Sequence, residues 1–417
     1  MPKSTPARRR FLTGAAALAG GALAANARNA PAQDNANPPN TPKWMKEPGD
    51  AIRTNQYGQP SPFEKNVIRR DRGDNVMPGA GISFSPLQNQ FGTITPSGLV
   101  FERHHAGIPA IDPAQHRLML HGMVKRPLLF TMEELRRFPS VSRVHFIECS
   151  GNGSREWKTP YGKSVQTTHG LLSNCEWTGV LLSTVLDEAG VAPDAAWVLA
   201  EGADGAAMTR SVPLAKCLED AMLVYAQNGE KLRPEQGYPL RLFLPGWEGN
   251  MSIKWLRRLK VGDQPFMTRE ETSKYTDSMP DGTARQFTLS MDAKSVITYP
   301  APDHKLAGAG FHEIFGLAWS GNGRIKRVDV STDGGRNWRE AALQEPVLHR
   351  ALVCFRLPWQ WNGEPAVLQS RAIDETGYVQ PTRAQLVALR GTNNQYHYNA
   401  IQSWAVARSG EISTVYA

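Results

Sequence analysis

Between residues 91 and 284, short apolar runs alternate with segments of helical spacing. The run at 144–147 predicts a strand that enters a core. The segment 179–189 places apolar residues at helical spacing and ends before a glycine, which predicts a helix. The runs at 196–200 and 240–244 predict two further buried strands. Since these segments follow no regular strand–helix–strand period, we expect an α+β domain rather than a doubly wound one.

After about residue 285, the pattern changes to short alternating segments that predict strands. These segments lie at 314–319, 324–332, 353–357 and 368–374. Asp333-Gly334-Gly335 is a strong turn signal and predicts a hairpin that leads to Trp338. Short strands with turn signals between them favour an antiparallel β-sandwich of immunoglobulin type, which we assign to residues 285–417.

The N-terminus has the features of an export signal. Arg8-Arg9-Arg10-Phe11-Leu12 precedes a mildly apolar run at 15–25. The twin arginine predicts export by the Tat route, with residues 1–33 as the signal and the periplasm as the destination. A membrane anchor is the alternative, but the run is shorter than the roughly 20 residues that a spanning helix needs, and no other span is expected. Residues 34–90 begin rich in Pro, Asn and Gln, so we expect an extended, poorly cored arm.

Charge and cysteine content exclude several classes of protein. The formal net charge is +8, but residues 1–33 hold five basic and no acidic residues, so the chain without them carries only +3. That charge is too small to indicate a nucleic-acid partner. The four cysteines form no C-x-x-C pair, which excludes a zinc ribbon, a thioredoxin-like motif and a c-type haem site. We expect few or no disulfides, because Tat cargo folds in the reducing cytoplasm.

Cys149 is the residue with the clearest potential for chemistry. It stands at the end of the strand predicted at 144–147, and two glycines follow it in a tight loop. A thiol held beside glycines can bind a soft metal or an anionic cofactor. The alternative is a small buried hydrophobic residue. A cysteine hydrolase that pairs Cys149 with His145 or His169 is a weaker interpretation, because four residues of strand place His145 about 13 Å away.

Six sequence blocks, taken together, resemble the sulfite oxidase family of molybdenum enzymes. They are FERHHAGIPAIDP at 101–113, ECSGN at 148–152, SNCEWTGVLLSTVL at 173–186, GYPLRLFLPGWEGNMSIKWLRRLKV at 237–261, GLAWSGNGRIKRVDVSTDGGRNW at 316–338 and SRAIDETGYVQP at 370–381. The blocks follow the family's order and cover roughly residues 91–390. The resemblance implies a mixed α/β molybdopterin-binding domain at 91–284 and an immunoglobulin-like dimerisation domain at 285–417.

Within the family, three segments are most similar to the molybdenum subunits of sulfane dehydrogenases. They are PGWEGNMSIKWLRR at 245–258, ETSKYTDSMPDG at 271–282 and HYNAIQSWAV at 397–406. The resemblance implies a periplasmic oxidoreductase of sulfur oxidation that transfers an oxygen atom from water to a sulfane sulfur. It implies a sulfur-carrier protein with a persulfidated cysteine as substrate and a dihaem cytochrome c subunit as electron acceptor. The chain has no haem motif of its own, and we expect a homodimer of it within a heterotetramer.

The resemblance also implies which residues form the site. Cys149 is expected to bind molybdenum beside the dithiolene sulfurs of a pyranopterin, and a thiolate suits such a centre. His105, in preference to His104, and Lys254 are expected to hold the pterin phosphate. Arg103 is expected to hold an oxyanion, because a guanidinium binds oxygen pairs bidentately. Four further positions complete the expected site: Ser150 and Asn152 at the cofactor, and Arg324 and Tyr275 at the substrate.

Two positions depart from the family's pattern. After the cysteine, the family commonly reads C-A-G-N-R-R, whereas here the second arginine is lost or is displaced by one position to Arg155. Met251 occupies a position where the family often has arginine. Both changes lower the positive charge near the centre, so a carrier-bound substrate is favoured over doubly charged free sulfite. On this hypothesis, Met251→Arg raises the turnover of free sulfite.

Two alternative functions stay open. A periplasmic sulfite:cytochrome c oxidoreductase that acts on free sulfite has the same motifs and differs in the charge of its pocket. A module that only binds a cytochrome would not need Cys149, Arg103 and Lys254 together. A molybdenum assay separates the binding module from both enzymes.

Overall fold

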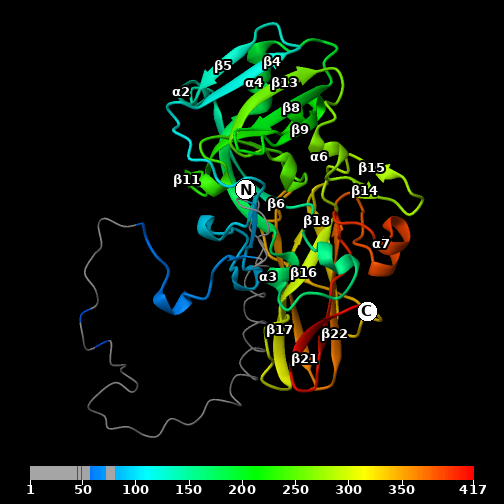
Figure 1. Ribbon diagram of the computed structural model, residues 1–417. Helices are drawn as coiled ribbons and strands as arrows, with labels where there is room; N and C mark the ends of the chain where they lie inside the picture. Colours follow the sequence, from blue (N-terminus) through cyan, green and yellow to red (C-terminus); the bar gives the residue numbers. More distant parts are fainter. Residues whose placement is uncertain (1–44, 46–47, 49–56, 72–79) are drawn as a thin grey trace, which may run out of the picture. The chain divides into compact units, whose positions relative to one another are not determined.

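A computed structural model describes residues 45, 48, 57–71 and 80–417 of the chain (Figure 1). Residues 62–417 form one compact unit, and the residues before Pro62 belong to another. The Tat signal expected at 1–33 and much of the first half of the arm expected at 34–90 lie outside the described residues. Among the residues that are described, no helix has the length and apolar character needed to cross a membrane.

The N-terminal domain is built on two five-stranded sheets. The first has the strand order β11-β10-β7-β6, with β12 paired to β10, and the second has the order β5-β4-β13-β8-β9. The pairing is antiparallel except between β13 and β4, which run parallel. The strand bounds are β4 Arg117–Gly122, β5 Leu128–Thr131, β6 Ser140–Glu148, β7 Leu172–Leu181, β8 Trp197–Gly202, β9 Thr209–Pro213, β10 Met222–Gln227, β11 Glu230–Lys231, β12 Arg241–Phe243 and β13 Leu256–Gly262.

One apolar core joins both sheets to the helices α4 (Leu182–Ala189) and α5 (Leu214–Glu219). The strands expected at 196–200 and 240–244 are confirmed as β8 and β12, whereas the helix expected at 179–189 begins only at Leu182. The residues before Leu182 extend β7 and pair with β10. Gly179 permits this close pairing, because a Cβ atom there would lie 2.1 Å from the Leu223 carbonyl oxygen. The close approach of the two backbones therefore makes residues 179–181 part of a strand, although their side-chain spacing suits a helix.

Strand β6 delivers Cys149 to the end of a sheet. It pairs with β7 along all nine of its residues, from Ser140 opposite Val180 to Glu148 opposite Leu172. The strand expected at 144–147 is thus confirmed, and its final residues are buried. The chain then turns into the short helix η5 (Ser154–Trp157).

A small three-stranded sheet includes part of the segment that is expected to be an extended arm. Strands β1 (Arg70–Asp71), β2 (Gly81–Phe84) and β3 (Glu102–His104) pair in that order. Leu87, which follows β2, is buried in a core shared with the C-terminal domain. The part of the expected arm from residue 81 onward is therefore built into the fold, because its apolar residues have partners that the Pro-rich composition does not reveal.

The C-terminal domain is an antiparallel β-sandwich, as expected. One sheet has the order β16-β17-β21-β20 and the other β19-β18-β22-β23-β24 (Figure 1). Their bounds are β16 Lys294–Tyr299, β17 Gly310–Trp319, β18 Ile325–Ser331, β19 Arg339–Glu340, β20 Ala342–Leu343, β21 Val353–Trp361, β22 Ala366–Asp374, β23 Ser403–Val406 and β24 Ile412–Val415. Side chains of both sheets form one core. The expected hairpin is also present, with Asp329 opposite Glu340.

Short elements complete the chain. The helices are η2 Pro62–Glu64, η3 Leu87–Asn89, η4 Ser97–Leu99, α2 Met132–Leu135, α3 Val165–His169, η6 Pro234–Gln236, η7 Gly249–Met251, α6 Arg269–Thr272 and α7 Arg383–Arg390, and a two-stranded sheet joins β14 Asp277–Ser278 to β15 Ala284–Arg285. Capping boxes at Thr131 and Thr382 satisfy the first backbone N–H groups of α2 and α7. All four cysteines are free thiols, and Cys175, Cys217 and Cys354 are buried.

Candidate active site

A cavity in the N-terminal domain brings together six of the nine expected site residues. They are Arg103, His104, His105, Cys149, Lys254 and Tyr275. These residues come from the end of β3, the end of β6, the turn before β13 and the segment after α6. Separate stretches of sequence, each identified by its own motif, thus meet at one place.

The backbone around Cys149 fixes the thiol at the cavity wall. Its N–H donates to the Leu171 carbonyl oxygen at 3.0 Å, and its carbonyl oxygen accepts from the Asn152 N–H at 2.9 Å. Burial raises the pKa of the thiol, and the positive charge of Arg103 opposes this rise. A cation beside a thiol favours the thiolate, which is the form that binds a metal.

Lys254 is held by acceptors from three neighbouring residues. Its Nζ donates to the carbonyl oxygens of Arg103 and Glu235, each at 3.1 Å, and to Nδ1 of His104 at 2.7 Å. Burial, and next the charge of Arg241, hold the pKa of Lys254 well below its usual range. Lys254 lines the cavity, and its expected contact with an anion stays a prediction. An anion that binds there would compete with these three acceptors.

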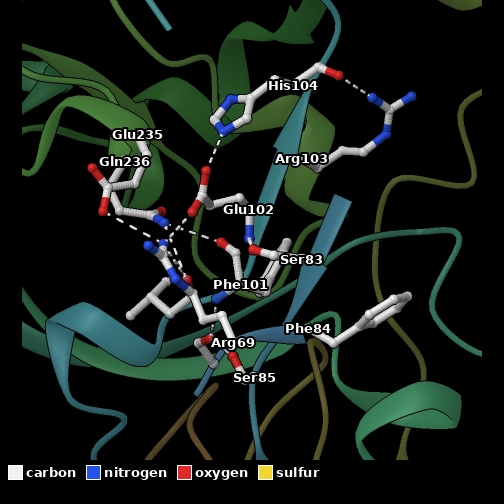
Figure 2. A network of polar contacts seen from close by, with 12 residues as sticks. Arg69, Ser83, Phe84, Ser85, Phe101, Glu102, Arg103, His104, Glu235 and Gln236 are labelled. Atoms are coloured by element: carbon white, nitrogen blue, oxygen red, sulfur yellow. Dashed lines mark hydrogen bonds and ion pairs between the residues drawn. The ribbon is translucent and has the colours of Figure 1, made fainter. Parts of the chain in front are cut away.

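The two histidines face different partners. His104 Nε2 contacts Glu102 at 2.7 Å, and Arg69 pairs with the same carboxylate (Figure 2). The hydrogen bond from His104 is the largest cause of the lowered pKa of Glu102. His105 Nε2 instead contacts the Tyr275 hydroxyl at 3.0 Å. His104 thus links Glu102 to Lys254, whereas His105 contacts Tyr275.

His105 is neutral at physiological pH. Burial, and next the charge of Arg103, lower its pKa to about 3. A neutral imidazole can exchange a hydrogen bond with the Tyr275 hydroxyl but supplies no positive charge. Burial also raises the pKa of Tyr275, which keeps its proton. The expected phosphate contact of His105 would therefore be a neutral hydrogen bond.

Arg241 is a cavity residue that is absent from the expected site residues, although it lies in the sequence block at 237–261. It is buried, and it donates to the Ser252 and Gln236 carbonyl oxygens, each at 3.2 Å. Burial lowers its pKa to about 9, so it remains charged at pH 7. Three basic side chains, those of Arg103, Arg241 and Lys254, thus line the cavity against the single carboxylate of Asp204. This excess of positive charge suits an anionic ligand.

A second buried arginine connects the cavity wall to the cysteine loop. Arg210 pairs with Glu248 at 3.2 Å and contacts the side-chain oxygen of Asn250. Asn250 in turn donates to the Ser150 hydroxyl at 3.2 Å. Although burial opposes it, Arg210 lowers the pKa of Glu248 to about 2. The sequence signal for Arg210 is its position in β9, two residues before the core residue Val212 and on the same face.

Ser150 and Asn152 shape the loop and do not line the cavity. The Ser150 carbonyl oxygen accepts from the His397 N–H at 2.8 Å, which adds a contact from the C-terminal domain. Asn152 donates to Glu148 at 2.9 Å and accepts from the Leu171 N–H at 3.2 Å. Their expected contact with a cofactor would therefore be indirect.

Arg324 is not brought to the cavity. Its side chain is exposed, and its backbone N–H donates to Glu375 at 3.0 Å. The C-terminal domain instead places Arg390 near this region. Arg390 is buried and pairs at 3.1 Å with Asp277, two residues after Tyr275. Arg324 lies in an exposed position just before β18, so its surroundings do not fit the expected role.

The two departures from the family pattern also have structural explanations. Met251 is completely buried in the core that joins the two sheets and does not line the cavity. Arg155 lies 4.0 Å from the ring centroid of Tyr161, outside the cavity lining. The idea that Met251 directly tunes the charge of the pocket is thus wrong, because its side chain points into an apolar core.

We expect Met251→Arg to destabilise the protein rather than to raise the turnover of free sulfite. An arginine in this apolar core lacks a carboxylate partner, and a buried unpaired charge costs about 3 kcal/mol or more. Urea unfolding of Met251→Arg beside Met251→Leu measures the difference. The leucine variant keeps the volume and should stay within about 1.5 kcal/mol of the parent. Equal stability of the two variants would contradict the buried position.

Neither histidine proposed for a cysteine hydrolase acts on Cys149. His145 Nδ1 contacts the Arg350 carbonyl oxygen at 3.3 Å, and its ring stacks on Phe243. His169 Nδ1 contacts the Thr168 hydroxyl at 2.9 Å. A general base needs hydrogen-bond reach to its nucleophile. The hydrolase interpretation therefore has no geometric support in these residues.

We expect His145 to make the protein sensitive to acid. Burial lowers its pKa to about 4, against about 6.5 in an unfolded chain. Between these values the unfolded state binds the proton more readily, so stability falls as the pH falls from 6.5 to 4, by roughly 3 kcal/mol. Urea unfolding at pH 7.0, 5.5 and 4.5 measures this loss. His145→Phe should flatten the pH dependence, and parallel curves for parent and variant would contradict the assignment.

Comparisons with known proteins agree with this geometry. Residues 105–270 match the model of the oxidoreductase molybdopterin binding domain, and residues 285–404 match that of the Mo-co oxidoreductase dimerisation domain. A sulfite oxidase of Gallus gallus is 33% identical over 72% of this chain and 70% of its own length. The mitochondrial sulfite oxidase of Mus musculus is 32% identical over 75% of this chain.

A solved structure extends the likeness to most of the chain. The crystal structure of the sulfane dehydrogenase SoxCD from Paracoccus pantotrophus contains a chain that is 50% identical, with a TM-score of 0.87. The match covers 89% of this chain and 96% of that one. By contrast, the chain spans only 61–62% of the length of the mouse, rat and Drosophila sulfite oxidases.

Proposed function

Because the chain belongs to the sulfite oxidase family of molybdenum enzymes, we propose that it is the molybdenum subunit of a sulfane dehydrogenase. It would oxidise a sulfane sulfur carried on a cysteine of a carrier protein and pass the electrons to a c-type cytochrome subunit. The observation that carries this proposal is the cavity in which Cys149 meets Arg103 and Lys254. The 50% identity to a SoxCD chain, against 31–33% to the sulfite oxidases, favours the sulfane branch.

The residues of the cavity fit a molybdopterin cofactor. Cys149 offers one soft thiolate, which suits a metal whose other sulfur ligands belong to the cofactor. Arg241 offers positive charge for the cofactor's phosphate, Lys254 offers N–H donors, and Gln236 and Ser252 add polar atoms to the same wall. Gly249 leaves no side chain at a point where a Cβ atom would lie 2.8 Å from the Glu148 carbonyl oxygen. This allows the turn before β13 to approach the end of β6.

The side chains of this site would bind and orient the substrate. When bound, the cofactor supplies the oxidation of sulfur: the sulfur loses two electrons, one water molecule provides the oxygen atom and two protons are released. Arg103 would hold the oxygen atoms of the product with its guanidinium group. Tyr275 and neutral His105 would place a proton donor and acceptor at the same wall, because they already share a hydrogen bond.

The proposal extends to the assembly and the destination of the protein. The match to a dimerisation domain supports a homodimer, and the match to SoxCD supports a heterotetramer with a dihaem cytochrome c subunit. The twin arginine at residues 8–9 supports export to the periplasm by the Tat route. Mass measurement of the complex with and without the cytochrome tests the first part, and the location of a signal-deleted chain tests the second.

Cytochrome c reduction by the molybdenum-loaded protein with its dihaem partner tests the proposed activity. The substrates to compare are free sulfite and a carrier protein with a persulfidated cysteine, with the same carrier alkylated at that cysteine as the control. Fast reduction with the persulfidated carrier alone supports the proposal. Fast reduction with sulfite alone would instead support the second candidate, a sulfite:cytochrome c oxidoreductase, which the sulfite oxidase relatives favour.

A further inference from the structure

A buried ion pair joins the C-terminal domain to the strand end that carries Cys149. Lys294 of β16 places its Nζ 3.0 Å from Oε1 of Glu148, the residue immediately before Cys149. Both side chains are 0–1% exposed. We propose that this pair positions the Cys149 thiolate for the metal. This inference rests on the proposed function. The C-terminal domain would then be part of the redox site as well as of the dimer.

The pair holds both sides of the turn that follows Cys149. Lys294 Nζ also approaches the Asn152 carbonyl oxygen at 3.4 Å, on the far side of the turn. The Asn152 side chain donates to the same Glu148 oxygen at 2.9 Å. One cation thus contacts the residue before Cys149 and the residue three positions after it.

A second residue of the C-terminal domain completes the partners of Glu148. Trp319 Nε1 donates to Oε2 of Glu148 at 2.7 Å. Each carboxylate oxygen of Glu148 therefore has a strong donor from the C-terminal sandwich. Lys294 and Tyr398 also pack against Gly153 of the turn, where an added Cβ atom would lie 3.7 Å from Lys294 Nζ and 3.2 Å from the Tyr398 ring.

The arrangement leaves Glu148 dependent on Lys294. Without the ammonium group, a buried carboxylate would face only the neutral donors Trp319 and Asn152, which is an unfavourable state for a charge out of water. The strand end would then move or open to admit water, and Cys149 lies next in the chain. The position of the thiol is thus coupled to a lysine in the other domain.

Lys216 provides a matched control. It is also buried, pairs with Asp220 at 2.7 Å, donates to the Pro245 carbonyl oxygen at 2.8 Å and lies 5.3 Å from the Trp247 ring centroid. Lys294 Nζ likewise lies 5.9 Å from the Trp319 ring centroid, so each lysine has one carboxylate, one carbonyl and one indole. The described contacts of Lys216 do not include the turn at 149–152. Lys216→Met should destabilise the protein without a specific effect at that turn.

The test compares Lys294→Met, Lys216→Met and the double variant Glu148→Gln/Lys294→Met in the full chain. Hydrogen exchange of the amides of Asn152 and Ser154, which are hydrogen-bonded within the turn, should become about tenfold faster in Lys294→Met relative to Lys216→Met. The visible charge-transfer absorption of the molybdenum–thiolate bond should shift in Lys294→Met only. The double variant, which removes the unpaired charge, should restore the exchange rate.

The outcomes separate this inference from the proposed function. Equal exchange and equal absorption in the two lysine variants would overturn the positioning role. If Lys294→Met fails to fold, the double variant decides: exchange at the parent's rate would support the role, because removal of the unpaired charge restores the turn, and fast exchange in a folded double variant would overturn it. Absence of molybdenum from the parent protein would overturn the proposed function, while the exchange comparison would still decide the role of Lys294.

Discussion

Cys149→Ser is expected to abolish molybdenum-dependent cytochrome c reduction, by about 10³-fold or more. A serine hydroxyl is a far poorer ligand for a soft metal than a thiolate, because it is hard and stays protonated at pH 7. The substitution removes little else. The turn is held by backbone hydrogen bonds to Leu171 and Asn152, and these do not involve the side chain of Cys149.

Steady-state cytochrome reduction and molybdenum content together measure this effect. Cys354→Ser is the matched control, because its sulfur donates to the Gly92 carbonyl oxygen at 3.4 Å and a serine hydroxyl can make the same contact. The control should keep activity and metal. Cys149→Ser that retains more than about a tenth of the parent's turnover per molybdenum would contradict metal ligation by Cys149.

Most of the fold could be predicted because its signals are local. The sandwich strands alternate along their own sequence, and Asp333 with its two glycines marks the hairpin. The predictions are wrong where contacts between segments far apart in the sequence determine the secondary structure. Residues 179–181 suit a helix by side-chain spacing, but they extend β7 because Gly179 lets β10 approach closely. Composition predicts an arm that includes residues 81–90, but Leu87 packs against apolar residues more than 50 positions away in the sequence.

The site shows the same division between local and distant information. Arg103, Cys149 and Lys254 lie in separate motifs, so each could be found without knowledge of its neighbours. Arg241 lies in the same block as Lys254, but its contacts to Gln236 and Ser252, which place it in the cavity wall, form only after the turns fold together. Arg324 and Arg390 are both arginines of the C-terminal domain, and sequence spacing does not tell which one is buried.

Arg103→Gln is expected to lower kcat/KM about 10²-fold, in line with the loss of one charged donor from an active site. Arg103 is the cation that several groups of the site share. Its charge opposes the burial that raises the pKa values of Cys149, Tyr275 and Tyr396, and it adds to the burial that lowers the pKa of His105. These four groups come from separate parts of the chain, so Arg103 lies where they meet.

The guanidinium of Arg103 has donors to offer a ligand. Its Nη1 contacts the His104 carbonyl oxygen, the one hydrogen bond of this side chain within residues 80–417 (Figure 2). A planar group with five N–H donors can therefore bind oxygen atoms bidentately while it keeps this contact. Because a guanidinium group does not lose its proton in proteins, the loss in Arg103→Gln should not depend on pH.

Cytochrome reduction with the persulfidated carrier and with sulfite, each at several concentrations, measures the effect of Arg103→Gln. Arg103→Lys should recover part of kcat/KM, since it restores the charge but not the bidentate geometry. Arg126→Gln is the control, because Arg126 is 63% exposed and pairs only with Glu188 among the described ion pairs. A loss in Arg126→Gln equal to that in Arg103→Gln would mean that the net charge of the protein attracts the substrate. A large loss in Arg103→Gln alone would place the effect in the cavity, where the positive charge faces Cys149.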